Sequence, residues 1–328
     1  MSETEDALRA VARALIGEPE LTAAEVAADA GFDPDQLRRI WQALGFPPVP
    51  EAERVFTRAD VAALRGVRSL VEEYGIAPEV LIQLTRVAGQ SLSRIAEAQV
   101  SATADRLAAL RLADGADARA LEPLMQQTVG VTTNLEPSLA HVWRRHLLAA
   151  LLRLAATPGE TTRDARTLVV GFADLVDFTA LSQQLDERDL AERVDRFEAL
   201  AYEHILQHGG RVVKMIGDEV MFAVDGTGAA ADTALALVEA YAGDPALPDV
   251  RIGLARGPVL SWEGDLFGPT VNLASRLVNL ARPGTVLVSE TVAAELEGRD
   301  GFVLRPLRPL RLKGIGRTRT FVLRRAGR

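Results

Sequence analysis

Two carboxylates beside strand-like segments are the residues of this sequence best suited to chemistry. Asp174 follows an apolar run, residues 168–173, that is typical of a buried strand. Asp218 lies at the turn of a predicted hairpin, residues 211–224, in which Gly217 permits the turn. Carboxylates suit hard divalent cations, and two ions shared by two Asp residues suit phosphoryl or nucleotidyl transfer. The two segments together therefore predict a site for two-metal chemistry.

The preference of this chain for Arg draws attention to its lysines. Of 37 basic residues only two are Lys, namely Lys214 and Lys313. Lys carries a compact, strongly hydrated charge, so in an Arg-rich chain it suits tasks that the planar fork of Arg cannot perform. Lys214 lies four residues before Asp218, and Lys313 precedes a Gly turn where it could anchor a triphosphate. The alternative is that both are ordinary surface lysines.

A third motif, residues 264–276, places polar groups on a predicted helix and in the loop before it. Asn272 and Arg276 are four residues apart and therefore share one helix face. An amide and a guanidinium on one face can hold a sugar and a phosphate, with Arg stabilising the charge of a transfer reaction. A solvated helix face is the alternative. Asp265 lies in the preceding loop.

The elements that must position these residues form two predicted domains. A length of 328 residues favours two domains, and the segment 157–166, rich in Pro, Gly and Thr, is the natural linker. Residues 1–156 show helical patterns and predict an all-α domain. Residues 167–328 alternate strands and helices in the order βαββαβ, which predicts a ferredoxin-like domain. The predicted fold class is α+β.

The N-terminal region predicts several short helices followed by longer ones. Asp33 with Pro34, and Thr57 with Asp60, have the pattern of helix starts. The short helices resemble a helix-turn-helix of the MerR-like type, which would bind DNA, but the region is net negative and a protein-interaction module is the alternative. Two further helices are expected before the linker, divided near Pro137 because Pro interrupts helical hydrogen bonds.

Composition excludes several classes of function. The chain has no Cys, which excludes disulfides, thiolate metal sites and cysteine nucleophiles. Its net charge of −8 argues against nonspecific nucleic-acid binding. No apolar run is long enough to span a membrane, and the polar N-terminus does not resemble a signal peptide. We therefore expect a soluble, cytoplasmic protein. His204 and His208 have zinc-ligand spacing on a helix, but no third ligand is evident.

Four segments together resemble the catalytic domain of class III nucleotidyl cyclases. In chain order they are FADLVDFT, VVKMIGDEVMFAV, GDLFGPTVNLASR and LKGIG. The resemblance covers about residues 165–325 and implies conversion of ATP to 3′,5′-cyclic AMP and pyrophosphate. It also implies that Asp174 and Asp218 bind two Mg²⁺ or Mn²⁺ ions. The family usually has Gly where this chain has Asp177, and we do not assign Asp177 to the metal site.

The same resemblance implies roles for the remaining candidates. Lys214 and Asp265 match the pair that reads adenine, with Lys at ring N1 and Asp at the exocyclic amine. Asn272 matches the residue that orients the ribose. Arg276 matches the residue that stabilises the transition state at the α-phosphate.

The resemblance also implies how the triphosphate is held and how the site is assembled. Lys313 matches the triphosphate-binding Lys, although Arg317 could share that role. In this family the site lies between two catalytic domains. Because this chain has one such domain carrying every motif, a homodimer is implied, and a monomer is expected to be inactive.

Residues 1–156 resemble the regulatory domain of soluble bacterial cyclases that are autoinhibited and sense pH. Two hypotheses for the signal follow. Protonation of His141 and His146 could shift the helix before the linker. Alternatively, the Leu- and Ala-rich helices enclose an apolar ligand such as a fatty acid. The alternative for the whole chain is a non-catalytic nucleotide sensor whose N-terminal region is a MerR-like DNA-binding module.

Overall fold

The chain forms two compact units, Met1–Pro158 and Gly159–Arg328. Among the described residues the first unit is helical apart from one isolated bridge between Leu21 and Phe56, and the second is α+β, as predicted. No helix in the described part of the chain combines the length and the apolar character needed to cross a bilayer. The computed structural model describes residues 3–114, 121–155, 166–312 and 314–327.

The N-terminal unit contains six helices in its described residues. They are α1 Glu3–Ile16, α2 Ala23–Ala30, α3 Pro34–Ala43, α4 Arg58–Glu72, α5 Pro78–Asp114 and α6 Leu121–Ala155. Thr22, Asp33 and Thr57 begin α2, α3 and α4, and each forms a capping box with the residue three positions later. The caps satisfy N–H groups that would otherwise lack partners. These helices enclose an apolar core that includes Val26 and Leu37.

Pro137 lies inside α6, so the prediction of two helices divided near this residue is wrong. Pro removes one backbone hydrogen bond but does not forbid a helix whose other bonds persist. The turn before Pro137 has additional bonds, because the side chains of Thr133 and Asn134 donate to the carbonyls of Val129 and Gly130 at 3.1 and 2.8 Å. The helix therefore continues past the Pro.

The C-terminal unit is built on an eight-stranded sheet in which the strand order is β2-β3-β1-β4-β6-β10-β7 and β5 pairs with β4. The antiparallel order β2-β3-β1-β4 is that of the predicted ferredoxin-like unit. The strands are β1 Arg166–Leu175, β2 Arg211–Ile216, β3 Glu219–Val224, β4 Val250–Trp262, β5 Asp265–Phe267, β6 Val286–Ser289, β7 Phe302–Pro306, β8 Leu310–Leu312, β9 Gly316–Thr318 and β10 Thr320–Arg325.

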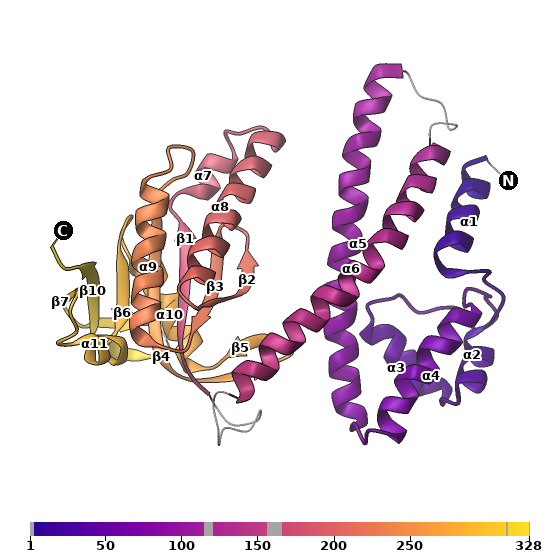
Figure 1. Ribbon diagram of the computed structural model, residues 1–328, viewed down its shortest axis with the longest axis horizontal. Coiled ribbons are helices and arrows are strands. Elements are labelled where there is room, and N and C mark those ends of the chain that lie inside the picture. Colours follow the sequence, from indigo (N-terminus) through magenta and orange to yellow (C-terminus); the bar gives the residue numbers. More distant parts are fainter. Residues whose placement is uncertain (1–2, 115–120, 156–165, 313, 328) are drawn as a thin grey trace. The chain divides into compact units, whose positions relative to one another are not determined.

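Helices cover the two faces of this sheet unequally. They are α7 Phe178–Ser182, α8 Glu187–Gln207, α9 Thr227–Ala242, α10 Pro269–Leu280 and α11 Glu290–Leu296. Phe197 of α8, Tyr241 of α9 and Leu296 of α11 belong to the core on one face. Ala274 and Leu277 of α10 belong to the core on the other. Figure 1 shows α8 and α9 in front of the sheet and α10 behind it. The face that carries α10 is the less covered one.

A glycine on β4 sets how closely α10 approaches the sheet. A Cβ atom at Gly253 would lie 2.3 Å from the backbone nitrogen of Val278 and 2.6 Å from the carbonyl oxygen of Ala274. Both atoms belong to the backbone of α10, which cannot give way as a flexible side chain can. The helix therefore rests directly on the backbone of β4, and its outward face is fixed by that contact.

Candidate active site

The end of β1 and the turn of the β2–β3 hairpin bring two predicted carboxylates together. Asp174 lies one residue before the end of β1, where it pairs in register with Glu219 of β3. The backbone N–H of Leu175 donates to the carbonyl of Asp218 at 3.1 Å, which ties the hairpin turn to the strand end. Asp174 and Asp218 are therefore neighbours, although more than forty residues separate them in the sequence.

Charge and burial perturb these carboxylates. The Asp174 side chain is only 14% exposed, and an Nη atom of Arg251 contacts it at 2.6 Å. Burial raises the pKa of Asp174, the negative charge of Asp218 adds to the rise, and Arg251 opposes it. Burial, together with the charges of Asp174 and Asp218, raises the pKa of Glu219 to about 7. The cluster thus holds more negative charge than its guanidinium offsets, which favours a divalent cation.

The donor set fits a cation that arrives with phosphate. Among the residues described, no three His, Asp or Glu side chains already form a metal cage. Mg²⁺ usually takes one or two protein carboxylates and completes its shell with phosphate oxygens and water. Asp174 and Asp218 meet that requirement, so they could hold the metal ions that the sequence predicts.

Asp177 lies just beyond β1 and occupies an unusual backbone conformation. Its φ angle is +56°, in the left-handed region, and its side chain makes no capping hydrogen bond to α7. Gly adopts this conformation without strain, and Asp tolerates it better than most residues. The backbone at this position therefore has the conformation that favours Gly, which is the residue that the resemblance implies here. Asp177 is exposed and stays outside the proposed metal site.

Lys214 and Asp265 are brought into direct contact by a bulge and a hairpin. The register of β2 against β3 shifts between Val212 and Lys214, which is the mark of a β-bulge. Because side chains alternate along a strand, the extra residue turns Lys214 to the face of its partner Met221, which belongs to the core under α10. There the Lys214 ammonium donates to the carboxylate of Asp265.

Asp265 is held in place from a second side. Its other carboxylate oxygen accepts a hydrogen bond of 2.7 Å from the backbone N–H of Leu266. Its cross-strand partner on the β4–β5 hairpin is Trp262, and the next pair on that hairpin face is Leu260 with Phe267. These three apolar side chains are 46%, 43% and 46% exposed, respectively. The Lys–Asp pair therefore lies beside an uncovered apolar surface.

Asn272 and Arg276 lie on the outward face of α10. Both are exposed, whereas Ala274, Leu277 and Val278 on the opposite side of the helix are buried in the core. The amide and the guanidinium therefore point away from the sheet, as their spacing predicts. No described partner restrains them, so they are available to a ligand.

The remaining candidates are not part of this arrangement. Lys313 lies outside the described residues, whereas Arg317 is exposed on β9. His141 and His146 are exposed on α6 in the N-terminal unit. His208 contacts the carbonyl of His204 at 2.8 Å, and the described residues contain no metal-binding group that includes either His.

Sequence reasoning missed two charged residues of the site, Arg251 and Glu219. Both lie directly across from Asp174, on β4 and β3 respectively. Glu219 is adjacent to Asp218, so the hairpin motif contained the signal for it. Arg251 lies two residues before Gly253 on β4, and its position beside Asp174 could be recognised only by knowing that β4 pairs with β1. Sheet register, which sequence alone does not supply, is what brings these two residues to Asp174.

Comparisons with known proteins show what this chain is similar to. Residues 161–325 match the family model of the adenylate and guanylate cyclase catalytic domain, and residues 1–153 match the adenylate cyclase regulatory domain. An adenylate cyclase of Streptomyces coelicolor is 37% identical over 88% of this chain and 75% of that protein. A pH-sensitive adenylate cyclase of Mycobacterium tuberculosis is 31% identical over 93% of this chain and 78% of that protein. One similar solved structure is the catalytic core of a rhodopsin-guanylyl cyclase with converted specificity, in complex with ATPαS. It is 26% identical, covers 50% of this chain and 98% of that chain, and aligns with a TM-score of 0.47.

Proposed function

The chain belongs to the family of adenylate and guanylate cyclases, and we propose that it converts ATP to 3′,5′-cyclic AMP and pyrophosphate. It contains the catalytic domain of these enzymes, and relatives with 36% and 37% identity are named adenylate cyclase. The single observation that carries the choice of ATP over GTP is the contact between Lys214 and Asp265.

The Lys–Asp pair matches the edge of adenine. Adenine presents an acceptor at ring N1 beside a donor at its exocyclic amine, which suits an ammonium next to a carboxylate. Guanine reverses both polarities in the same orientation, so Lys214 would face an N–H and Asp265 would face a carbonyl oxygen. Unpaired polar groups in a site carry a penalty of about 1–3 kcal/mol each. We therefore assign adenine recognition to this pair.

The metal site is assigned to Asp174 and Asp218, with two Mg²⁺ or Mn²⁺ ions. Such ions activate an attacking hydroxyl and neutralise phosphate charge. The contribution of the protein is mainly positional and electrostatic. Asn272 orients the ribose, so that its 3′-hydroxyl lies in line with the α-phosphorus, and Arg276 stabilises the charge that develops there. Lys313 is proposed to bind the triphosphate, with Arg317 as a second cation for that role.

A homodimer is proposed to complete the site. Leu260, Trp262 and Phe267 form an exposed apolar patch beside Asp265, and a second copy of the catalytic domain would remove it from water. The helices α8, α9 and α11 already cover the opposite sheet face, so the face with α10 is the one left for a partner. In this arrangement one protomer supplies Asp174 and Asp218, and its partner supplies Asn272, Arg276 and the adenine-reading pair Lys214 and Asp265.

A product assay on the full chain tests the reaction. We expect cyclic AMP from ATP in the presence of Mn²⁺, little cyclic GMP from GTP, and loss of activity in Asp174→Asn. Absence of cyclic AMP under all metal conditions, with nucleotide binding unaffected by Asp174→Asn, would mean that the domain senses nucleotide without turning it over.

Complementation tests the shared site separately. Asp174→Asn and Arg276→Ala are each expected to be inactive as homodimers. When the two variants are co-expressed in equal amounts, half of the dimers are mixed, and each mixed dimer contains one intact site. The expected activity is about one quarter of that of the wild type. If the site were built within one protomer, the mixture would stay inactive.

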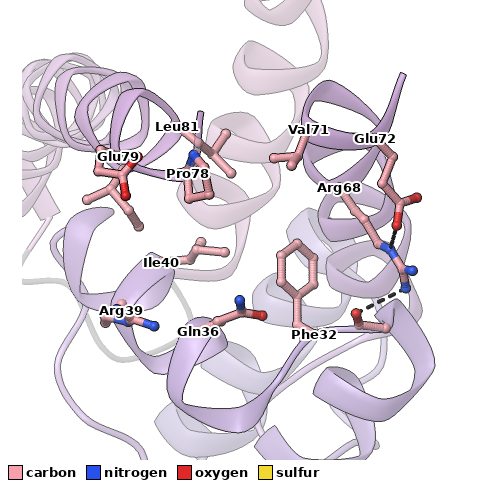
Figure 2. Close-up of a pocket in the computed structure, with 12 residues that line it drawn as sticks. Phe32, Gln36, Arg39, Ile40, Arg68, Val71, Glu72, Pro78, Glu79 and Leu81 are labelled. Carbon is pink, nitrogen blue, oxygen red and sulfur yellow. Dashed lines mark hydrogen bonds and ion pairs between the residues drawn. The ribbon is translucent and has the colours of Figure 1, made fainter. Parts of the chain in front are cut away.

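The N-terminal unit is proposed to regulate the catalytic domain. The proposed division is a regulatory domain over 1–156, a linker over 157–166 and a catalytic domain over 167–328. Within the first unit two adjoining cavities of about 320 and 330 Å³ share the lining residues Ile40 and Leu81. Figure 2 shows Ile40 beside the aromatic ring of Phe32 in the first cavity. The second cavity has a mostly apolar lining, and its size is at the lower end of that of ligand sites.

Two experiments separate the proposed signals. If an apolar ligand such as a fatty acid controls activity, delipidated protein differs in activity from protein as purified, and mass spectrometry finds a bound lipid. If proton binding to His141 and His146 is the signal, replacing both with Gln shifts the pH profile of activity. An unmoved profile rules out the histidines, and unchanged activity without bound lipid rules out the ligand.

A further inference from the structure

The last part of the chain carries more positive charge than the proposed reaction uses. Residues 301–328 contain nine Lys and Arg residues and no Asp or Glu, whereas residues 159–300 contain 12 basic and 24 acidic residues. Only Lys313 and Arg317 of the nine are proposed to bind the triphosphate. A basic segment in a chain with a net charge of −8 has a local field of the opposite sign, which attracts an anionic partner.

Most of these cations lie on one long hairpin, residues 302–325, which we call the basic arm. Its stem is the antiparallel pair β7–β10, and its tip is the antiparallel pair β8–β9. Between the two parts the backbone N–H of Leu307 donates to the carbonyl of Thr320 at 2.9 Å. Both strands of the arm carry exposed Arg side chains that form no ion pair with any residue the structure describes, namely Arg305, Arg308, Arg311, Arg317 and Arg324.

The two faces of the stem differ because side chains alternate along a strand. Arg325 points to α9, where two carboxylates pair with it at 3.0 and 3.1 Å. Arg324 points the opposite way and lies directly across from Val303, with Arg305 two residues further along β7. Val303 is 48% exposed. These three residues, Val303, Arg305 and Arg324, form a sheet surface, which we call the stem face, that is apolar at one position and cationic at two.

The stem face lies away from the proposed active site. In the strand order of the sheet β7 is the fourth strand from β1 and forms the edge. At about 4.8 Å per strand it lies roughly 19 Å from the strand that carries Asp174. Figure 1 shows β7 and β10 at the end of the sheet opposite β2. A partner on the stem face therefore need not compete with nucleotide.

An anionic lipid bilayer fits this surface better than a nucleic acid does. The headgroups of a bilayer offer anions to the two guanidinium groups, and the boundary of its acyl chains accepts an exposed apolar side chain such as Val303. Proteins bind nucleic acids through elements that enter a groove or through aromatic side chains on which bases stack. The aromatic residues of the basic arm are Phe302 and Phe321, and both pack against the core on the opposite face of the sheet.

We propose that the stem face docks the catalytic domain on anionic membrane surfaces. The contact is peripheral and reversible, because two Arg and one Val supply much less than the two anchoring signals that stable attachment needs. Each basic side chain close to an anionic bilayer strengthens binding by about fivefold. Salt screens this attraction, so binding weakens as ionic strength rises.

Sedimentation of the full-length protein with lipid vesicles tests the proposal without turnover. The vesicles contain phosphatidylcholine alone, or phosphatidylcholine with about one third phosphatidylserine. The wild type is expected to bind the vesicles with phosphatidylserine, to ignore those without it, and to dissociate when salt is added. Arg305→Gln combined with Arg324→Gln is expected to weaken binding by about 25-fold. Arg305→Gln alone is expected to weaken it by about fivefold, and it replaces the double variant if that fails to fold.

A matched control removes the same charge elsewhere on the chain. Arg38 of α3 and Arg188 of α8 are both exposed, and Arg38→Gln combined with Arg188→Gln is expected to bind vesicles within about twofold of the wild type. Unchanged binding by the stem variant, or an equal loss in both double variants, overturns the role of the stem face. Failure of the wild type to bind phosphatidylserine vesicles overturns the lipid assignment, and binding to a DNA duplex instead would identify nucleic acid as the partner.

Discussion

The contact between α10 and β4 should be indispensable to activity, and Gly253→Ala tests it. The change adds one methyl group and no charge. The methyl carbon would lie 2.3 Å from the nitrogen of Val278, whereas ordinary contact begins at 3.4 Å, so the helix must move outward by about 1.1 Å. No side chain can absorb this shift, because the atoms that clash belong to the backbone of α10.

Gly253→Ala should lower both the stability of the catalytic domain and its kcat. Overpacking of this kind typically costs about 1–3 kcal/mol, which for a domain of this size lowers Tm by roughly 2–12 °C. Asn272 and Arg276 move with the helix, and a displacement of about 1 Å at a reacting centre can lower the rate by about 100-fold. We therefore expect kcat for cyclic AMP formation to fall far more than the modest loss of stability would explain at 20 °C.

The assay compares kcat and Tm of Gly253→Ala with those of a second glycine variant. Gly243 ends α9, has a negative φ of −84°, and a Cβ atom there would meet its nearest neighbour at an ordinary 3.4 Å. Gly243→Ala should therefore keep wild-type kcat and should be neutral or more stable by up to about 1 kcal/mol. Wild-type kcat in folded Gly253→Ala would refute the argument that this contact positions Asn272 and Arg276.

Four further outcomes are expected from single substitutions. Arg276→Ala should lower kcat by about 100–1,000-fold with little change in KM, since its role is in the transition state; steady-state kinetics separates the two. Asp265→Asn should lower the preference for ATP over GTP by about 10–100-fold in kcat/KM, because a charge-assisted hydrogen bond is lost. The folded state raises the pKa of Glu219 to about 7, so the folded protein binds this proton more tightly than the unfolded chain does, and wild-type stability falls as pH rises from about 4.5 through 7. Gln cannot titrate, so the free energy of unfolding of metal-free Glu219→Gln should increase relative to that of the wild type by on the order of 3 kcal/mol between pH 4 and 8, as measured by urea unfolding. Tyr241→Phe removes a buried 2.7 Å hydrogen bond to the carbonyl of Phe197 and should cost about 1 kcal/mol of folding stability without altering kcat.

Much of the fold was predictable because its signals are local. The apolar strand before Asp174, the hairpin with Asp218 at its turn and the Gly and Pro residues at element ends each depend on a few neighbouring residues. The capping boxes at Thr57 and Asp33 are also local signals, and the structure contains both. The helix through Pro137 was not predictable from the same rules, because a Pro that breaks one bond is tolerated when its surrounding turns keep theirs.

The missing parts of the site depend on register. Period-two alternation from Val212 places Lys214 on the same face as that residue, toward α8, and only the bulge between them turns it toward Asp265. No residue type in that segment signals the extra position. The pairing of Arg251 with Asp174 has the same origin, because the two residues are 77 positions apart and meet only through the alignment of β1 with β4.

The topology of the sheet explains why the proposed site lies on one face. The connections β1–α8–β2 and β3–α9–β4 each join parallel strands with one strand between them, and such crossovers are almost always right-handed. Because β1 and β3 run in opposite directions and their crossovers move in opposite directions along the sheet, the same handedness places α8 and α9 on the same face. The other face receives α10, which follows the β4–β5 hairpin, and Gly253 lets this helix lie directly against β4. Because side chains alternate along a strand, Asp174 and Arg251 point to that face, and the bulge in β2 turns the side chain of Lys214 to it as well. The proposed reaction therefore depends on a side of the sheet that this topology leaves largely uncovered, which is also the side that a second protomer would have to cover.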